Sequence, residues 1–223
     1  MSSSEGESVM GQGKTDWDAY YRKSSGIVSF TRGITLRRLR RMMAPKLTKQ
    51  ELRICELGGG NSCFLDTFLR IDNLNRYHVI DSNDYSIRLL QDRFSSDARV
   101  TYETRDILRQ RESPELFDIV YSVGLIEHFS ELDTRECVRE HFKLLAPDGL
   151  VVITFPTPTV LYRVIRGIAE YFGVWIFHDE RPLQFSEVEA GIREASGTTT
   201  HQSINWFIGL TQGCVVAELN QTS

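Results

Sequence analysis

Several features that would assign a protein to a particular class are missing from this chain of 223 residues. Its four cysteines, at positions 55, 63, 137 and 214, show neither the spacing of metal ligands nor the pattern of a disulfide framework. We therefore expect buried free thiols in a reducing compartment, and a cytoplasmic protein. The net charge of −4 gives no general excess of positive charge for binding nucleic acid, although a local basic patch remains compatible with it.

Long apolar runs and a secretion signal are also absent. Residues 1–13 are mostly polar, which predicts a disordered tail and no signal peptide. The most apolar run, 164–177, contains Arg166 and Glu170 and is too short to cross a bilayer. The sequence thus predicts no transmembrane span, and it leaves peripheral membrane contact open. It predicts no particular oligomeric state.

The most informative segment is residues 54–62, Ile-Cys-Glu-Leu-Gly-Gly-Gly-Asn-Ser. An apolar strand runs into a glycine turn, where Gly58 and Gly60 allow backbone angles and close ligand approach that a Cβ would block. Apolar residues then recur at helical spacing from Phe64 to Leu69, so we expect Asn61 or Ser62 to cap a helix. Strand, turn and helix predict the first crevice of a nucleotide-binding α/β sheet.

The segment does not favour a nucleotide that is bound through its phosphates. The segment lacks the Gly-Lys-Ser/Thr of a phosphate-binding loop, and Cys63 stands where a dinucleotide fingerprint has its third glycine. Glu56, two residues before the first glycine, would repel a pyrophosphate. A positively charged ligand without phosphate fits better, such as adenosine that carries a sulfonium and an amino acid.

Strands and helices alternate through the rest of the chain. Further strands are predicted at 77–81, 100–104, 117–122, 150–155, 204–210 and 215–219, and helices near 85–94, 133–145, 161–172 and 186–195. Asp81 ends the second strand about 20 residues after the glycines, as a ribose diol requires, and Asp106 follows the third. Asp133 with Glu136 predicts a capping box, and the run 147–149, Pro-Asp-Gly, predicts a turn.

These elements resemble the class I S-adenosylmethionine-dependent methyltransferases, specifically the branch that acts on small molecules, glycans and lipids. The matching stretches cover residues 50–155 closely: Glu56-Leu57-Gly58-Gly59-Gly60, Asp81, Asp106, Phe117-Asp118-Ile119-Val120 with Glu127-His128-Phe129, and Leu144-Leu145-Ala146-Pro147-Asp148-Gly149-Leu150. Ser62 departs from the pattern, because many members have a third glycine there.

The resemblance implies a Rossmann-like, doubly wound, seven-stranded α/β sheet, mostly parallel with an antiparallel strand in its C-terminal hairpin and with helices on both faces. One methyltransferase domain would span 14–223, with a helical N-terminal cover at 14–50 and an acceptor-side insertion at 156–197. It implies S-adenosylmethionine as cofactor and S-adenosylhomocysteine as product. The implied cofactor-binding residues are Tyr21, Glu56, Gly58, Gly60, Asn61, Asp81, Ser82, Asp106, Ile107, Ser122 and Val123.

Methyl transfer of this kind needs alignment and, for some acceptors, a base. His128 is the first candidate base because it follows the fourth strand; alternatively it only orders the loop or contacts the cofactor. His178 is the second candidate and Glu127 the third. No group of His, Asp or Glu has metal-ligand spacing in the sequence, so no metal is predicted.

Three other regions have two interpretations each. Trp17, Tyr20 and Tyr21 either cover the cofactor, as the resembled family often arranges, or pack on the sheet. The basic run from Arg32 to Arg41 is interpreted as the solvated face of a helix rather than as an anionic-substrate or membrane patch. The insertion 156–197 is expected to roof the acceptor pocket, with a plain surface loop as the alternative.

The predicted function is therefore methyl transfer to a small-molecule, glycan or lipid acceptor, at an oxygen atom. Two other classes stay open, namely a nicotinamide-dependent reductase and a cofactor-binding partner subunit without catalysis. Methylation of nucleic acid bases is disfavoured, because the run 122–125, Ser-Val-Gly-Leu, replaces the Asn/Asp-Pro-Pro-aromatic motif used for base amino groups.

Overall fold

The structure is a computed structural model that describes residues 15–22, 26–109, 115–206 and 211–220. The predicted disordered tail, 1–13, lies outside these residues. The strands are β1 (Leu52–Leu57), β2 (Leu74–Asp81), β3 (Val100–Thr104), β4 (Phe117–Val123), β5 (Leu145–Pro156), β6 (Gly197–Asn205) and β7 (Gln212–Leu219). The helices are α1 (Trp17–Arg22), α2 (Gly26–Met43), α3 (Leu65–Phe68), α4 (Asp84–Phe94), α5 (Glu131–Lys143), α6 (Val160–Tyr171) and α7 (Phe185–Glu194), with a 3₁₀ turn η1 at Ile126–His128.

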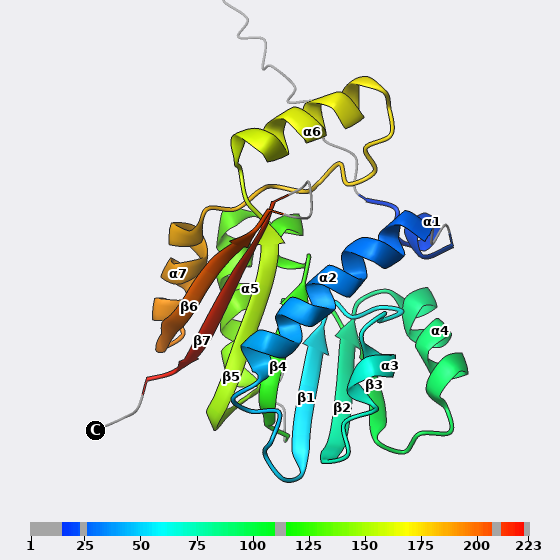
Figure 1. Cartoon of the computed structure of the whole chain (residues 1–223), viewed down its shortest axis with the longest axis vertical. Coiled ribbons are helices and arrows are strands. Elements are labelled where there is room, and N and C mark those ends of the chain that lie inside the picture. Colours follow the sequence, from blue (N-terminus) through cyan, green and yellow to red (C-terminus); the bar gives the residue numbers. More distant parts are fainter. Residues whose placement is uncertain (1–14, 23–25, 110–114, 207–210, 221–223) are drawn as a thin grey trace, which may run out of the picture.

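The strands form one seven-stranded sheet in the order β3-β2-β1-β4-β5-β7-β6. The first five strands in the chain pair in parallel, and β7 lies antiparallel between β5 and β6. The order reverses between β1 and β4, and the C-terminal ends of these two strands lie side by side (Figure 1). In open α/β sheets this reversal marks the ligand crevice. The predicted fold class is confirmed.

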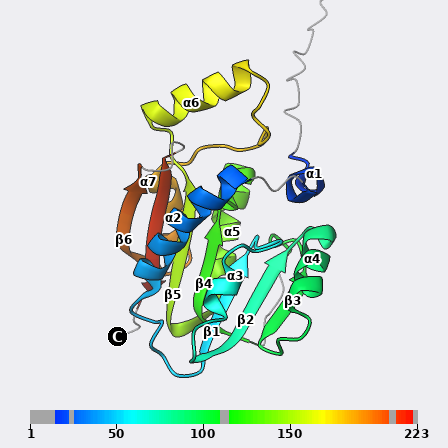
Figure 2. The same ribbon diagram turned by 45° about the vertical axis from the view of Figure 1, so that its right-hand side comes forward.

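Apolar side chains on alternate strand positions pack against helices on both faces of the sheet. One core joins the sheet to α2, α3 and α4, and includes Leu39, Phe68 and Leu90. The other core joins it to α5 and α7, and includes Val138 and Ile192. Figure 2 shows α2 across one face and α5 behind the sheet. Among the described residues, no helix combines the length and apolar character needed to cross a bilayer.

Three predicted elements outside the glycine turn and its helix differ from the structure. The sixth strand is Gly197–Asn205 rather than 204–210, and 207–210 lie outside the described residues. It is an edge strand with mostly half-exposed polar side chains, so it lacks the apolar alternation on which the prediction relied. The turn 147–149 lies within β5, as an irregularity in the pairing with β4.

The third difference is the start of α5. Its N-cap is Ser130, whose hydroxyl accepts a hydrogen bond from the Asp133 amide at 3.3 Å and donates to the Asp133 carboxylate at 2.7 Å. The N-cap is therefore Ser130 and not Asp133, and the predicted capping box of Asp133 with Glu136 is wrong. The helix begins one turn earlier because Ser130, and not Asp133, has the extended backbone of an N-cap.

Candidate active site

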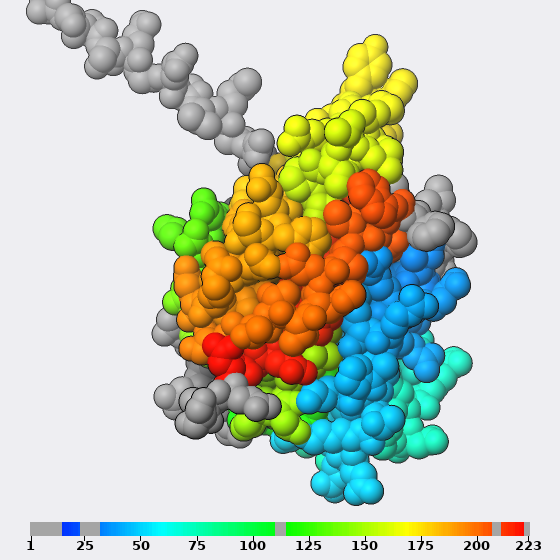
Figure 3. Space-filling view, turned by 60° about the vertical axis from the view of Figure 1, so that its left-hand side comes forward, coloured from blue at the N-terminus to red at the C-terminus, as the bar shows by residue number. Residues whose placement is uncertain are grey.

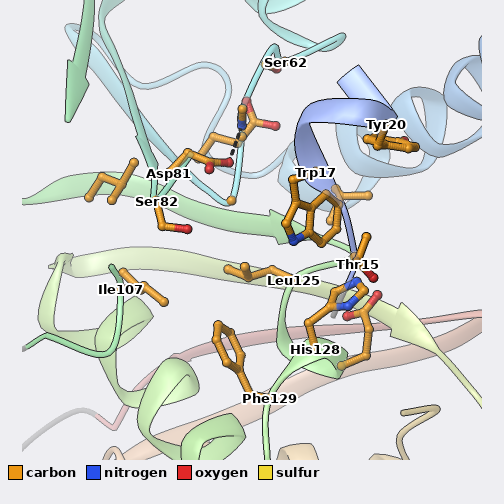
Figure 4. Close-up of a pocket in the computed structure, with 18 of the residues that line it drawn as sticks. Thr15, Trp17, Tyr20, Ser62, Asp81, Ser82, Ile107, Leu125, His128 and Phe129 are labelled. Carbon is orange, nitrogen blue, oxygen red and sulfur yellow. Dashed lines mark hydrogen bonds between the residues drawn. The ribbon is translucent and has the colours of Figure 1, made fainter. Parts of the chain in front are cut away.

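A cavity of about 810 Å³ opens at the C-terminal ends of β1, β2 and β4. Its walls come from the glycine turn after β1, the ends of β2 and β4, helix α1, and the loop between α6 and α7. The carboxyl ends of parallel strands meet at one edge of the sheet, so residues far apart in the sequence converge there. Figure 4 shows Asp81, Ser82 and Ile107 toward one end of the cavity, and Trp17, Thr15 and His128 toward the other.

The glycine turn forms a tight cradle. Gly58 has φ of 68°, a left-handed conformation that favours glycine, and its amide donates to the carbonyl of Ile80 at 2.8 Å. A Cβ on Gly60 would lie 2.2 Å from the Ser86 hydroxyl and 2.7 Å from the Asp81 carboxylate. No side chain larger than hydrogen fits at Gly60 without displacing a residue of the cavity.

The turn leads into a shorter helix than the sequence predicts. The N-cap of α3 is Phe64, so the predicted cap at Asn61 or Ser62 is wrong. The Ser62 hydroxyl nevertheless accepts hydrogen bonds from the amides of Phe64 at 3.2 Å and Leu65 at 3.3 Å. Asn61, the other predicted cap, has φ of 47° and accepts from the Arg93 guanidinium at 2.7 Å. Both residues line the cavity.

Asp81 holds the cradle in place. One of its oxygens accepts from the Gly60 amide at 2.7 Å and the other from the Asn83 amide at 2.8 Å. Burial raises the pKa of this carboxyl, although the hydrogen bonds to the charged form oppose that shift. Each carboxylate oxygen accepts more than one hydrogen bond, so capacity remains for hydroxyl donors of a ligand.

Glu56 lies beneath the turn as a buried acid. Its carboxylate accepts from the Tyr77 hydroxyl at 2.6 Å, and a Cβ on Gly59 would meet its side chain at 2.6 Å. Burial raises its pKa to about 7, although hydrogen bonds from Ser62, Tyr77 and Tyr121 lower it. A cation in the cavity would favour its ionised form.

The other predicted cofactor residues divide into two groups. Tyr21, Ser82, Asp106, Ile107 and Val123 line the cavity, and their contact with a cofactor stays a prediction. The Asp106 carboxylate is about half exposed and accepts from the Leu108 amide at 3.0 Å.

The structure does not bring Ser122 or His178 to the cavity. Ser122 is fully buried, and its hydroxyl pairs with the His141 ring at 2.9 Å on the opposite side of β4. Its neighbour Val123 faces the cavity instead, because successive strand residues point to opposite faces. His178 is exposed to solvent. Neither its predicted role as base nor the cofactor contact of Ser122 fits this geometry.

His128 lies at the end of the cavity away from Asp81. Its Nδ1 is 3.0 Å from a carboxylate oxygen of Asp179, which also accepts from the Thr15 hydroxyl. Burial lowers the pKa of His128, while Asp179 opposes the shift. Despite the opposing effect of burial, hydrogen bonds from Thr15 and His128 lower the pKa of Asp179. The ring of Trp17 packs edge-on against His128, with centroids 4.9 Å apart.

Three potential ligand groups gather beside His128. Atoms of Glu127, His128 and Glu180 lie within 4.8 Å of one another, an arrangement that could hold a cation. Glu127 is 2% exposed, and among the described residues its Oε2 has no hydrogen-bond partner. Burial, and then the charges of Glu180 and Asp179, raise its pKa well above the usual range. Spacing in the sequence could not reveal this group, because Glu180 comes from the distant insertion.

Sequence reasoning missed Asp179, Phe177 and Leu125 as cavity residues. The run 178–182 was charged and followed an aromatic stretch, so it was a visible signal, but nothing in it distinguished the cavity-facing Asp179 from the exposed His178. The hydrogen bond that joins Asp179 to His128 spans 51 residues. Phe177, Asp179 and Glu180 bring the stretch 156–197 to the cavity wall, and its role as the roof of an acceptor pocket stays a prediction.

Comparisons with known proteins agree with this architecture. Residues 54–149 match a family model described as a methyltransferase domain. Among curated proteins, none matches the chain. Magnesium protoporphyrin IX methyltransferase from Synechocystis PCC 6803, with bound S-adenosylhomocysteine, superposes with a TM-score of 0.73 at 11% identity, over 92% of this chain and 94% of that chain.

Two other solved structures are similar. The N-methyltransferase NodS from Bradyrhizobium japonicum WM9, in complex with S-adenosyl-L-homocysteine, gives a TM-score of 0.65 at 16% identity, over 90% of this chain and 92% of that one. A methyltransferase in complex with the Haloferax volcanii Trm112 activator gives a TM-score of 0.72 at 12% identity, over 94% of this chain and 100% of that chain. At such identities the likeness concerns the fold. Residues 54–149 are therefore similar to a methyltransferase domain, and the fold is that of the S-adenosylmethionine-dependent methyltransferases to which the chain was compared.

Proposed function

We propose that the protein transfers the methyl group of S-adenosylmethionine to an oxygen atom of a small-molecule, glycan or lipid acceptor. The observation that carries this proposal is the glycine cradle at the switch point, which opens into the same cavity as the His128–Asp179 pair. The acceptors named for similar structures include a magnesium porphyrin, which is consistent with a small-molecule acceptor.

The residues at the cradle fit the cofactor. Gly58 and Gly60 leave room for the chain backbone to approach a ligand closely, and Asp81 has free acceptor capacity for the ribose hydroxyls. Asp106 would accept from the adenine amine while the Ile107 amide contacts the ring. The buried carboxylate of Glu56 suits a ligand with positive charge.

The chain's own contribution to the reaction is alignment and proton removal. S-adenosylmethionine supplies a methyl group on a positively charged sulfur that leaves as a neutral thioether, so no general acid is required. Alignment of the two reactants contributes about 7–11 kcal/mol in well-oriented systems. Nδ1 of His128 is held by Asp179 at 3.0 Å, which leaves Nε2 to take the proton of an acceptor hydroxyl. Asp179 acts as a positioning residue, because it orients the ring and stabilises its charged form.

Thermal shift titration tests the cofactor assignment. We expect S-adenosylhomocysteine, and not NAD, to raise the melting temperature, because ligand binding to the folded state stabilises it. Stabilisation by NAD alone would favour the reductase alternative. Turnover of S-adenosylmethionine with a library of hydroxyl-bearing acceptors then separates an enzyme from a binding subunit. Cofactor binding without turnover on any acceptor would count against catalysis.

A further inference from the structure

Helix α6 turns its apolar side away from the protein. Val160, Val164, Ile168 and Tyr171 are exposed by 79%, 52%, 54% and 85%. At about 100° per residue these positions fall within one narrow arc of the helix surface. Leu161 and Phe172 widen the arc, with exposures of 40% and 70%. Helices on the surface of a globular protein normally bury such a stripe.

The inward side of the same helix carries Tyr162 and Arg166. Tyr162 is buried, and its hydroxyl donates to the Glu180 carboxylate. The Arg166 guanidinium donates to the Glu180 carbonyl at 2.8 Å and to the Glu170 carboxylate at 2.7 Å. The two hydrogen bonds to Glu180, which lies outside the helix, hold α6 in one rotation about its axis, with the apolar stripe facing outward.

The position of α6 leaves the stripe accessible. The helix lies at one extremity of the molecule and across its long axis, as two views agree (Figures 1 and 2). It forms the projecting end in the space-filling view (Figure 3). The exposed apolar surface continues through Val174 and Ile176, at 67% and 50% exposure. The chain then reaches Phe177, which lines the cavity.

The size and shape of the stripe distinguish between occupants. A helix of 12 residues is about 18 Å long and about 10 Å wide, so one face covers roughly 200 Å². Stable protein partners, including a second copy of this chain, bury about 800 Å² each. A projecting convex helix also has no groove into which a partner fits. A lipid surface needs no shape match, and the exposed Arg163 beside the stripe suits anionic headgroups.

We propose that α6 lies in the interface of a lipid bilayer and brings the mouth of the cavity to an acceptor carried by the membrane. The proposed membrane contact is inferred from the apolar stripe and does not depend on the proposed function. The proposal that the methyl acceptor is held in the membrane does rest on the proposed function. Of the acceptor classes above, this selects a lipid or a lipid-linked molecule.

Flotation of the full chain with lipid vesicles tests the proposal. Vesicles of phosphatidylcholine, alone and mixed with phosphatidylglycerol, should retain the wild-type protein, with stronger retention on the anionic mixture. Val164→Glu and Ile168→Glu should each lower the partition coefficient by at least about tenfold, because each puts a charge into the apolar interface. Both positions are exposed, so melting temperature and S-adenosylhomocysteine affinity should stay at wild-type values.

Leu132→Glu is the matched control, because Leu132 is an apolar residue of α5 with 77% exposure that does not belong to the stripe. It should bind vesicles as the wild type does. Absence of vesicle binding, or an equal loss in the Leu132 variant, would overturn the proposal. So would a dimer, seen by light scattering, that Ile168→Glu dissociates, since a second copy would then cover the stripe. None of these outcomes affects cofactor binding in solution, so a failure here is distinct from a failure of the proposed function.

Discussion

The two ends of the cavity are built in different ways. The cofactor end is made of strand ends and one glycine turn, fixed by backbone hydrogen bonds such as those from Gly60 and Asn83 to Asp81. The acceptor end joins side chains of three separate segments, through contacts of His128 with Asp179 and of Thr15 with Asp179. The first depends on the backbone of the sheet, whereas the second depends on side chains that the insertion and the N-terminal segment bring together. Variants at each end should therefore have separable effects.

The largest effect is expected from His128→Ala, which should separate chemistry from binding. If His128 is the base, the rate of methyl transfer should fall by roughly 10²–10⁴, while affinity for S-adenosylhomocysteine stays within a few-fold. Because burial lowers its pKa, the wild-type rate should decline only as pH falls below about 6.5. The variant should lose this decline at acidic pH, which is the acid limb of the pH–rate profile. His201→Ala, at an exposed histidine of β6, is the control. An equal fall in cofactor affinity and rate would make His128 a binding residue.

Asp81→Ala should act on the other end alone. Loss of hydrogen bonds to a charged group should weaken S-adenosylmethionine by about 1.5–3 kcal/mol, or more if the Gly60 cradle opens. Calorimetry measures this directly. Asp84→Ala removes an exposed acid nearby and should bind normally. Unchanged affinity in Asp81→Ala would remove the residue from the site.

Asp179→Asn should shift the pH profile of turnover. Asp179 raises the pKa of His128, so its neutral replacement should lower that pKa further and move the acid limb to lower pH. The rate should fall by roughly tenfold, the value of a hydrogen bond to a charged group. A merely structural role would lower the rate without moving the limb.

The smallest effect is expected from Asp106→Asn, because this carboxylate is about half exposed. Affinity should fall by about 0.5–1.5 kcal/mol for adenosine analogues that keep the exocyclic amine. An analogue that lacks the amine should bind wild type and variant alike. If the substitution lowers the affinity for both analogues equally, the assignment of Asp106 to the adenine amine is wrong.

The cofactor end could be predicted because its signals are short in range. Glycines that require special backbone geometry, and acids that end strands, are visible within a few residues. The assignment of Ser122 does not fit the structure, because the limits of a strand do not tell which face of the sheet each side chain is on. A shift of one residue moves the cavity-facing position from Ser122 to Val123. His128 was found from its place after β4, but no local pattern indicates that Asp179, and not His178, meets it. The outward orientation of the apolar side of α6 could likewise not be predicted, because an amphipathic pattern does not show which side of a helix is buried.

If Glu56 lies beside the bound cofactor, as proposed, cofactor binding would be coupled to the release of a proton. With a pKa of about 7 in the ligand-free protein, the carboxyl is about half protonated at neutral pH. The unfolded chain ionises near pH 4.5, so the folded protein loses stability as pH rises from there toward 7, because ionisation then favours the unfolded state. A bound cation stabilises the ionised form and expels the proton. Binding of S-adenosylmethionine would thus acidify its surroundings, and the calorimetric heat would depend on the ionisation enthalpy of the buffer, a dependence that Glu56→Gln abolishes.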